Sequence, residues 1–200
     1  MHRTVSTAQK PLAASTAERP ASPPLRSVAA TPSRSTRLFL ALWPGPRARE
    51  ALAAASDAWR WPPGSARVAP ERLHLTLHFL GSIEIERVGL VQAGVAVPFR
   101  GFELVLDRAG VWPHGIAVLL ARSTPPALAR LHRDLGAALA ALGVPLEARP
   151  WQPHVTLARR ALGARPPAAL SVLRWRVRGY ALVESRLGSN GGYRVLQRYG

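Results

Sequence analysis

The sequence predicts an α+β protein of two similar lobes with a cleft between them. Two copies of the pattern His-x-Thr-Leu, at 74–77 and 154–157, suggest that each lobe contributes one copy. Segments with strand and helix periodicity alternate before and after a central hairpin, and no residue-level repeat extends beyond the two motifs. The 200 residues, 48% of them hydrophobic, are enough for two such lobes with a real core.

Residues 1–36 are expected to form a disordered tail ahead of a single domain at 37–200. The tail is rich in Ala, Ser, Pro and Thr, and Glu18 is its one acidic residue. Such a segment buries too little apolar surface to offset the entropy lost on ordering. A transit peptide and a start codon assigned too early are the alternatives, although the prolines argue against an amphipathic transit helix.

The first strand is predicted at 38–43, a short apolar run that Pro44 and Gly45 close. Residues 46–59 predict a helix, because they are alanine-rich and their apolar positions recur at spacings of three and four. Pro46 suits the first turn of that helix.

The first motif strand is predicted at 72–81. Side chains alternate along a strand, so His74 and Thr76 share one face while the intervening leucines pack into a core. His78 follows on the face of Thr76, at the expected rim of the cleft. A metal site with His74 and His78 as ligands is the alternative, but the chain has no cysteine and few carboxylates near the motifs.

A helix at 83–95 is predicted next, followed by strands at 102–106 and 115–120. The turn between these strands contains Trp112 and His114, and His114 is expected to be exposed there.

The clearest amphipathic helix is predicted at 126–142, with Gly143 as its C-cap. His132 lies outside the leucine stripe of this helix and is expected to face solvent.

The second motif strand begins at His154, where Pro153 gives an extended entry. Further strand material is predicted at 173–186, a hairpin turn at 189–192 and a return strand at 193–199.

Each motif offers an imidazole with a hydroxyl two positions later. If the two strands face one cleft, one neutral ring can take a proton while the other, protonated, gives one. This chemistry suits an in-line displacement at a phosphodiester, whose oxygens need hydrogen-bond donors such as Thr76 and Thr156. Imidazoles with the ordinary pKa of about 6.5 predict a bell-shaped rate profile around neutrality.

The two motifs, together with 37–42, 73–81 and 149–159, resemble the 2H phosphoesterase superfamily. The likeness is greatest to the RNA 2',3'-cyclic phosphodiesterases, historically called 2'-5' RNA ligases, and runs from about Arg37 to the C-terminus. It implies a bilobal pseudo-twofold fold, with two antiparallel sheets facing a central cleft and helices outside. It also implies a hydrolase without metal or other cofactor that acts on RNA or nucleotides with a 2',3'-cyclic phosphate end.

The resemblance further assigns roles to individual residues. It implies that His154 is the proton acceptor and His74 the proton donor, with the 3' oxygen leaving and a 2'-phosphate as product. It suggests that Arg159 and Tyr193 approach the phosphate and that Trp112 lies against a base, with packing of Trp112 into the core as the alternative. Strict alternation puts Arg159 on the face opposite the motif side chains, so its involvement needs a bulge or the end of the strand.

The net charge of +16 suits a polyanionic partner such as RNA. However, Lys10 is the only lysine, and such a preference for arginine also follows from a GC-rich coding sequence. No apolar run approaches the length of a membrane span, so we expect a soluble protein with no membrane partner. The absence of cysteine fits a cytoplasmic location, and we expect a monomer with no metal partner.

Three alternative functions remain open from the sequence. One is a phosphodiesterase for another small cyclic phosphate, such as ADP-ribose 1'',2''-cyclic phosphate. Another is a protein that binds RNA ends without turnover. The last is a 2'-5' ligase that runs the reaction backwards.

Overall fold

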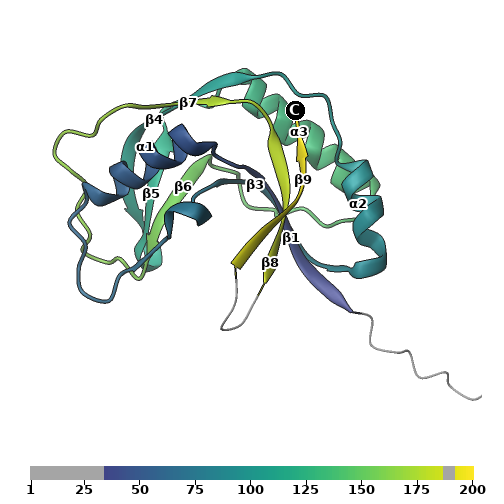
Figure 1. The fold of residues 1–200 in the computed structure, drawn as a ribbon, viewed down its shortest axis with the longest axis horizontal. Coiled ribbons are helices and arrows are strands. Elements are labelled where there is room, and N and C mark those ends of the chain that lie inside the picture. The colour runs from purple at the N-terminus through teal and green to yellow at the C-terminus, as the bar shows by residue number, and fades with distance from the viewer. Residues whose placement is uncertain (1–33, 187–191) are drawn as a thin grey trace, which may run out of the picture. The chain divides into compact units, whose positions relative to one another are not determined.

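The computed structural model of this protein describes residues 34–186 and 192–200, which lie in one compact unit, Ser33–Gly200. Within these residues nine strands form one curled antiparallel sheet (Figure 1). Their order is β7-β4-β5-β6-β3-β1-β8-β9, and β2 pairs with β6. The strands are β1 (Ser35–Leu42), β2 (Ala66–Arg67), β3 (Leu75–Glu84), β4 (Phe102–Trp112), β5 (Ile116–Ala121), β6 (His154–Arg159), β7 (Leu173–Val177), β8 (Tyr180–Arg186) and β9 (Gly192–Tyr199).

The α+β class is confirmed, but the prediction of two separate sheets is wrong. Four strands, β7-β4-β5-β6, form one half of the sheet and another four, β3-β1-β8-β9, form the other. The halves meet between β3 and β6 through the pair Leu75 and Val155. The two motif strands are therefore neighbours at the middle of one sheet. Strand periodicity does not predict this pairing.

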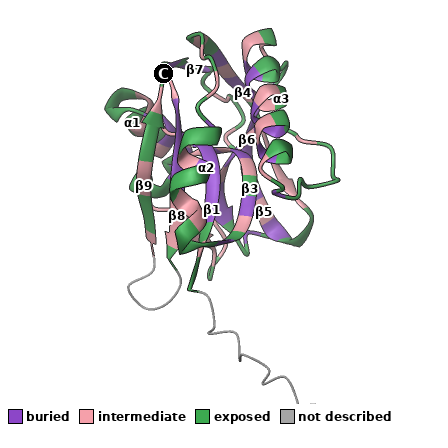
Figure 2. Cartoon of the chain, turned by 90° about the vertical axis from the view of Figure 1, so that its right-hand side faces the viewer, coloured by how far each residue is buried: buried purple, intermediate pink, exposed green. Residues whose placement is uncertain are grey.

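Three α-helices pack against one face of this sheet, namely α1 (Pro46–Asp57), α2 (Val88–Gly94) and α3 (Pro126–Ala141). Pro46 occupies the first turn of α1, as expected. Buried leucines of α1 and α3 share one hydrophobic core with Leu38, Leu40 and Leu42, alternate residues of β1. Figure 2 shows that β1 is buried along most of its length. The opposite face of β1 carries Phe39 and Ala41, and Trp43, directly after the strand, packs against them, so the sheet has a second face for the motifs.

Several element boundaries differ from the prediction. The first motif strand, predicted at 72–81, is Leu75–Glu84, so His74 directly precedes it, and the strand predicted at 102–106 extends to Trp112. The helix expected at 83–95 begins only at Val88, because β3 continues to Glu84 and a 3-10 turn, Ile85–Arg87, follows it. Ile83 is buried as part of the strand and pairs with Thr36, so its apolar character belongs to the sheet.

The strand material at 173–186 is two strands, β7 and β8, separated by Arg178 and Gly179. The first strand already begins at Ser35, two residues before the expected domain boundary. The predicted tail, apart from 34–36, and most of the turn at 189–192 lie outside the described residues. No helix in the described part of the chain is long and apolar enough to cross a membrane.

Candidate active site

The four motif side chains come together at the joint between β3 and β6. Leu75 and Val155 form the pair that joins the strands, and both are completely buried in the core. Their sequence neighbours therefore point to the opposite face. The antiparallel register through this pair sets His74 across from Thr156 and Thr76 across from His154.

Both motif histidines are held in the same way. His74 Nδ1 lies 2.6 Å from the carbonyl oxygen of Arg72, and His154 Nδ1 lies 2.7 Å from that of Gln152. A carbonyl only accepts, so each Nδ1 donates its hydrogen to the backbone two residues upstream. In the neutral rings this leaves Nε2 with a free lone pair, the form that a general base requires.

The surroundings lower the pKa of both rings. Desolvation by burial is the main cause at His74 and lowers its pKa to about 4, with smaller contributions from His154 and Arg159. Desolvation also lowers the pKa of His154, helped by the charges of Arg149 and Arg159. The expectation of unshifted imidazoles is therefore wrong, because the cleft removes water that would solvate an imidazolium.

Aromatic rings surround His74 on the cleft face. The Trp43 ring stacks on it with a centroid distance of 5.5 Å, and Phe39 lies 4.9 Å away. Tyr193 meets the same imidazole edge-on at 5.2 Å, with 40% of the tyrosine exposed. The guanidinium carbon of Arg72 lies over the Tyr193 ring, 5.9 Å from its centroid. Tyr193 is thus next to the first motif.

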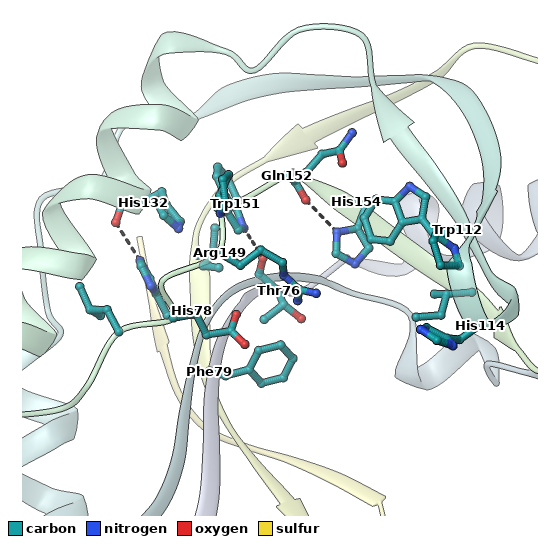
Figure 3. Close-up of a pocket in the computed structure, with 16 residues that line it drawn as sticks. Thr76, His78, Phe79, Trp112, His114, His132, Arg149, Trp151, Gln152 and His154 are labelled. Atoms are coloured by element: carbon teal, nitrogen blue, oxygen red, sulfur yellow. Dashed lines mark hydrogen bonds between the residues drawn. The ribbon is translucent and has the colours of Figure 1, made fainter.

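His154 lies at the edge of a cavity of about 580 Å³. The Trp112 ring packs on His154 with a centroid distance of 4.4 Å, and both line the cavity together with Thr76 (Figure 3). His114 also lines it, exposed as expected, with a left-handed backbone at φ 64°. The volume is in the range of pockets that bind nucleotide-sized ligands.

Arg159 reaches the motif face because β6 contains a bulge. Thr156 pairs with Val118 while Ala158 pairs with Ala117, which leaves Leu157 as an extra residue. Leu157 and Ala158 are consequently both buried, and Arg159 is exposed on the side away from the core. Its charge lowers the pKa of both motif histidines, as expected for a cation that faces both rings.

His132 and Trp151 were not predicted as parts of the site. His132 does not face solvent as expected, because its ring lies between those of His78 and Trp151 at centroid distances of 4.1 and 4.0 Å. Trp151 donates its indole Nε1–H to the carbonyl oxygen of Thr76 at 3.0 Å. The one feature of the sequence that could have pointed to this part of the site is the tryptophan three residues before the second motif histidine.

The described residues do not support a metal site at His74 and His78. Within 34–186 and 192–200 no three His, Asp or Glu side chains are grouped as metal ligands. His78 Nε2 instead lies 2.8 Å from the carbonyl oxygen of His132, while the His74 ring contacts Trp43, Phe39 and Tyr193. His78 lines the cavity, in agreement with its expected place near the cleft.

Comparisons with known proteins agree with this geometry. The chain is 35% identical over 179 residues to the RNA 2',3'-cyclic phosphodiesterase of Thermus thermophilus, covering 82% of this chain and 89% of that protein. It is 34% identical over 177 residues to the Escherichia coli enzyme of the same name, covering 84% and 94%.

Solved structures of E. coli LigT have a similar fold. The complex with NADP+ matches with a TM-score of 0.73 at 28% identity, and the complex with 3'-AMP matches with 0.72 at 29%. Each match covers 83% of this chain and 98% of the LigT chain. The model of the 2'-5' RNA ligase superfamily matches residues 48–188. The chain therefore belongs to the 2'-5' RNA ligase superfamily of 2H phosphoesterases.

Proposed function

We propose that this protein hydrolyses 2',3'-cyclic phosphate ends of RNA to a 2'-phosphate, without a metal, by acid–base catalysis with two histidines. The observation that carries the proposal is the equivalent setting of His74, directly before β3, and His154, the first residue of the adjacent β6. Both rings donate Nδ1–H to the backbone and share one face of the sheet. The matched relatives, named RNA 2',3'-cyclic phosphodiesterases, support the choice of substrate.

In the proposed reaction, His154 Nε2 removes a proton from the water that attacks phosphorus. The bond from the water oxygen to phosphorus forms while the bond from phosphorus to the ribose 3' oxygen breaks, and His74 protonates that oxygen. The product keeps the phosphate on the 2' oxygen. Exchange of protons with solvent then restores the neutral base and the protonated acid.

The remaining site residues would stabilise the negative charge. The hydroxyls of Thr76 and Thr156 would donate to the non-bridging oxygens, and Arg159 would supply a positive charge on the same face. Tyr193 would lie beside the phosphate and Trp112 against the base. The bound phosphate also raises the pKa of His74, because a nearby negative charge favours the imidazolium that the acid step requires.

The decisive experiment measures turnover of 2',3'-cyclic nucleotides and of RNA with a 2',3'-cyclic end in excess EDTA. We expect a nucleoside 2'-phosphate, identified by phosphorus NMR, from the parent protein. The variants His74→Ala and His154→Ala should each lose at least about a hundredfold in rate, the usual contribution of a positioned acid or base. Circular dichroism and thermal melting of each variant separate lost chemistry from lost folding.

Other outcomes would favour the alternatives. Loss of activity in EDTA would contradict metal independence, and a 3'-phosphate product would contradict the assigned leaving group. Binding of RNA ends without turnover would favour the non-catalytic binder. Turnover of ADP-ribose 1'',2''-cyclic phosphate alone would favour a small cyclic phosphate as substrate. Joined RNA that forms only at high end concentration would mark ligation as the reverse of hydrolysis.

A further inference from the structure

One wall of the cavity is a stack of three aromatic rings from three separate parts of the chain. His78 comes from β3, His132 from α3 and Trp151 from the loop before β6. The His78 and His132 rings are 18° apart in plane, and those of His132 and Trp151 are 14° apart. Centroid separations of 4.1 and 4.0 Å make this a continuous stack.

Hydrogen bonds fix the stack relative to the first motif. Trp151 is tied through Nε1–H to the carbonyl of Thr76, and His78 is tied through Nε2 to the carbonyl of His132. Burial lowers the pKa of His78, and it lowers that of His132 to about 4. Both rings are therefore neutral near pH 7 and stack without charge repulsion.

The stack ends at Trp151, beside the cavity. Among the residues that the structure describes, His132 is the one ring in contact with Trp151, on one side of the indole. Figure 3 shows His132 and Trp151 on one side of the cavity and His154 and Trp112 on the other. The Trp112 ring opposite packs on His154, and the exposed Phe79 also lines the cavity. Trp151 differs from both because a hydrogen bond to Thr76 and the stack on His132 hold its indole in place at the cavity wall.

We propose that Trp151 binds the nucleobase of the nucleotide whose cyclic phosphate lies at the two motif histidines. The inference rests on the proposed function and specifies its substrate as a nucleoside 2',3'-cyclic phosphate with the base bound by stacking. A purine offers more area to the indole than a pyrimidine does, so purine ends are the better substrates. Because the stack is held in place by hydrogen bonds, binding costs little further ordering of this wall.

The test compares two substrates that differ only in the base. One is adenosine 2',3'-cyclic phosphate, and the other is the 2,3-cyclic phosphate of methyl riboside, which has no base. Trp151→Leu should lower kcat/KM for the adenosine substrate by about tenfold or more, the usual scale of one stacked base. The loss should lie mainly in KM, and kcat/KM for the base-free substrate should stay within about twofold of the parent by the same reasoning.

Trp61 provides a matched control. Its ring also stacks on a neighbour, Trp59, at 5.1 Å, and its Nε1–H also donates to a backbone carbonyl, that of Ser56, at 3.0 Å. Trp61 does not line the cavity, so Trp61→Leu should leave the ratio of the two kcat/KM values unchanged. Trp151→Phe, which keeps a ring but loses the N–H, should fall between the parent and Trp151→Leu for the adenosine substrate.

An equal loss on both substrates in Trp151→Leu would overturn the proposal, because it would show that Trp151 only holds Thr76 in place. If the parent protein hydrolysed neither substrate, the proposed function would fail. The base site at Trp151 would then be tested separately, by ligand binding. Calorimetry with 2'-AMP and with ribose 2-phosphate should then show a preference for 2'-AMP that Trp151→Leu removes. The same preference in the variant would contradict a base site at Trp151.

Discussion

His74 and His154 owe their tautomer to a backbone carbonyl two residues upstream. The spacing of the motifs predicts that each histidine shares a face with its threonine, because alternation is a local property of a strand. It does not predict the tautomer or the pKa, because both depend on the groups that a distant strand and its aromatic neighbours bring to the ring. The lowered pKa values of the two histidines therefore had to come from the structure.

These lowered pKa values change the expected dependence on pH. The reaction needs one protonated and one neutral ring, and in the free protein this combination is most populated between the two pKa values. Since burial lowers the pKa of His74 to about 4 and also lowers that of His154, kcat/KM should peak below about pH 6.5, the ordinary value for histidine. The anionic substrate favours the imidazolium, so the kcat profile should lie at higher pH than that of kcat/KM. Both profiles can be measured from pH 4 to 9, and a kcat/KM that rises through pH 9 would contradict the pairing.

Arg159 contributes to the same pH dependence. Its positive charge lowers the pKa of both histidines, so its removal should raise both values. We expect Arg159→Gln to move the kcat/KM optimum to higher pH while lowering activity throughout, because the phosphate loses a cation. The measurement is the same profile on the variant, with Arg130→Gln on α3 as a control that removes a distant charge. An optimum that stayed in place would show that the charge of Arg159 does not set the pKa values of the two histidines.

At the scale of elements, a bulge directly after each motif threonine shapes the site. In β3 Thr76 pairs with Ala41 and His78 with Leu40, so Leu77 is an extra residue, as Leu157 is in β6. Strict alternation predicted the motif faces and the cavity position of His78 correctly, but it put Arg159, beyond the bulge in β6, on the opposite face. A bulge depends on the register of the neighbouring strand, which one strand's own sequence does not contain.

The helix α3 shows the same division between local and distant information. Its leucine stripe was predicted and is buried in the core, at Leu128, Leu131, Leu135 and Leu139. The prediction that His132 faces solvent is wrong, because periodicity identifies only the helix face that packs on the sheet. Periodicity does not indicate that Trp151, in the loop before β6, stacks on the His132 ring.

Gly136 in α3 offers a test of this packing. A Cβ added there would lie 3.5 Å from His78 Cε1 and 3.6 Å from Leu146 Cδ1, both ordinary contacts. Gly136→Ala should therefore stabilise the protein by about 0.5–1 kcal/mol, the difference in helix propensity. Gly94→Ala, at the end of α2, is a contrasting control because its Cβ would meet Leu142 Cδ1 at 2.8 Å. Urea unfolding measures the free energy of unfolding of both variants. A destabilised Gly136→Ala would mean that His78 is packed too tightly to admit a methyl group.

At the scale of the whole domain, the sequence predicted the α+β class and the meeting of the two motifs, and it missed the single sheet. Each half could be anticipated because its strands and helices follow local periodicity. The joint could not, because β3 and β6 are linked by one register pair and by the bond from Trp151 to Thr76. One residue pair and one hydrogen bond produce no periodic pattern in the sequence, although these two contacts set the distance between the two histidines.

This joint predicts that stability and activity respond differently to two equivalent substitutions. Leu75 and Leu104 are both completely buried leucines in strands, but only Leu75 lies at the joint, between His74 and Thr76. Truncation of either to alanine should cost about 2–5 kcal/mol of stability.

The void left by Leu75→Ala lies where β3 meets β6 and lets the motifs shift against each other. A displacement of about 1 Å is enough to cost up to about a hundredfold in rate. Leu75→Ala should therefore lower kcat by about tenfold or more at a temperature where it is fully folded, by the same sensitivity to position. Leu104→Ala should lose stability but keep its kcat. Thermal melting and turnover of adenosine 2',3'-cyclic phosphate measure both variants side by side. Equal losses of kcat in both variants would show that the distance between the histidines is set elsewhere in the fold.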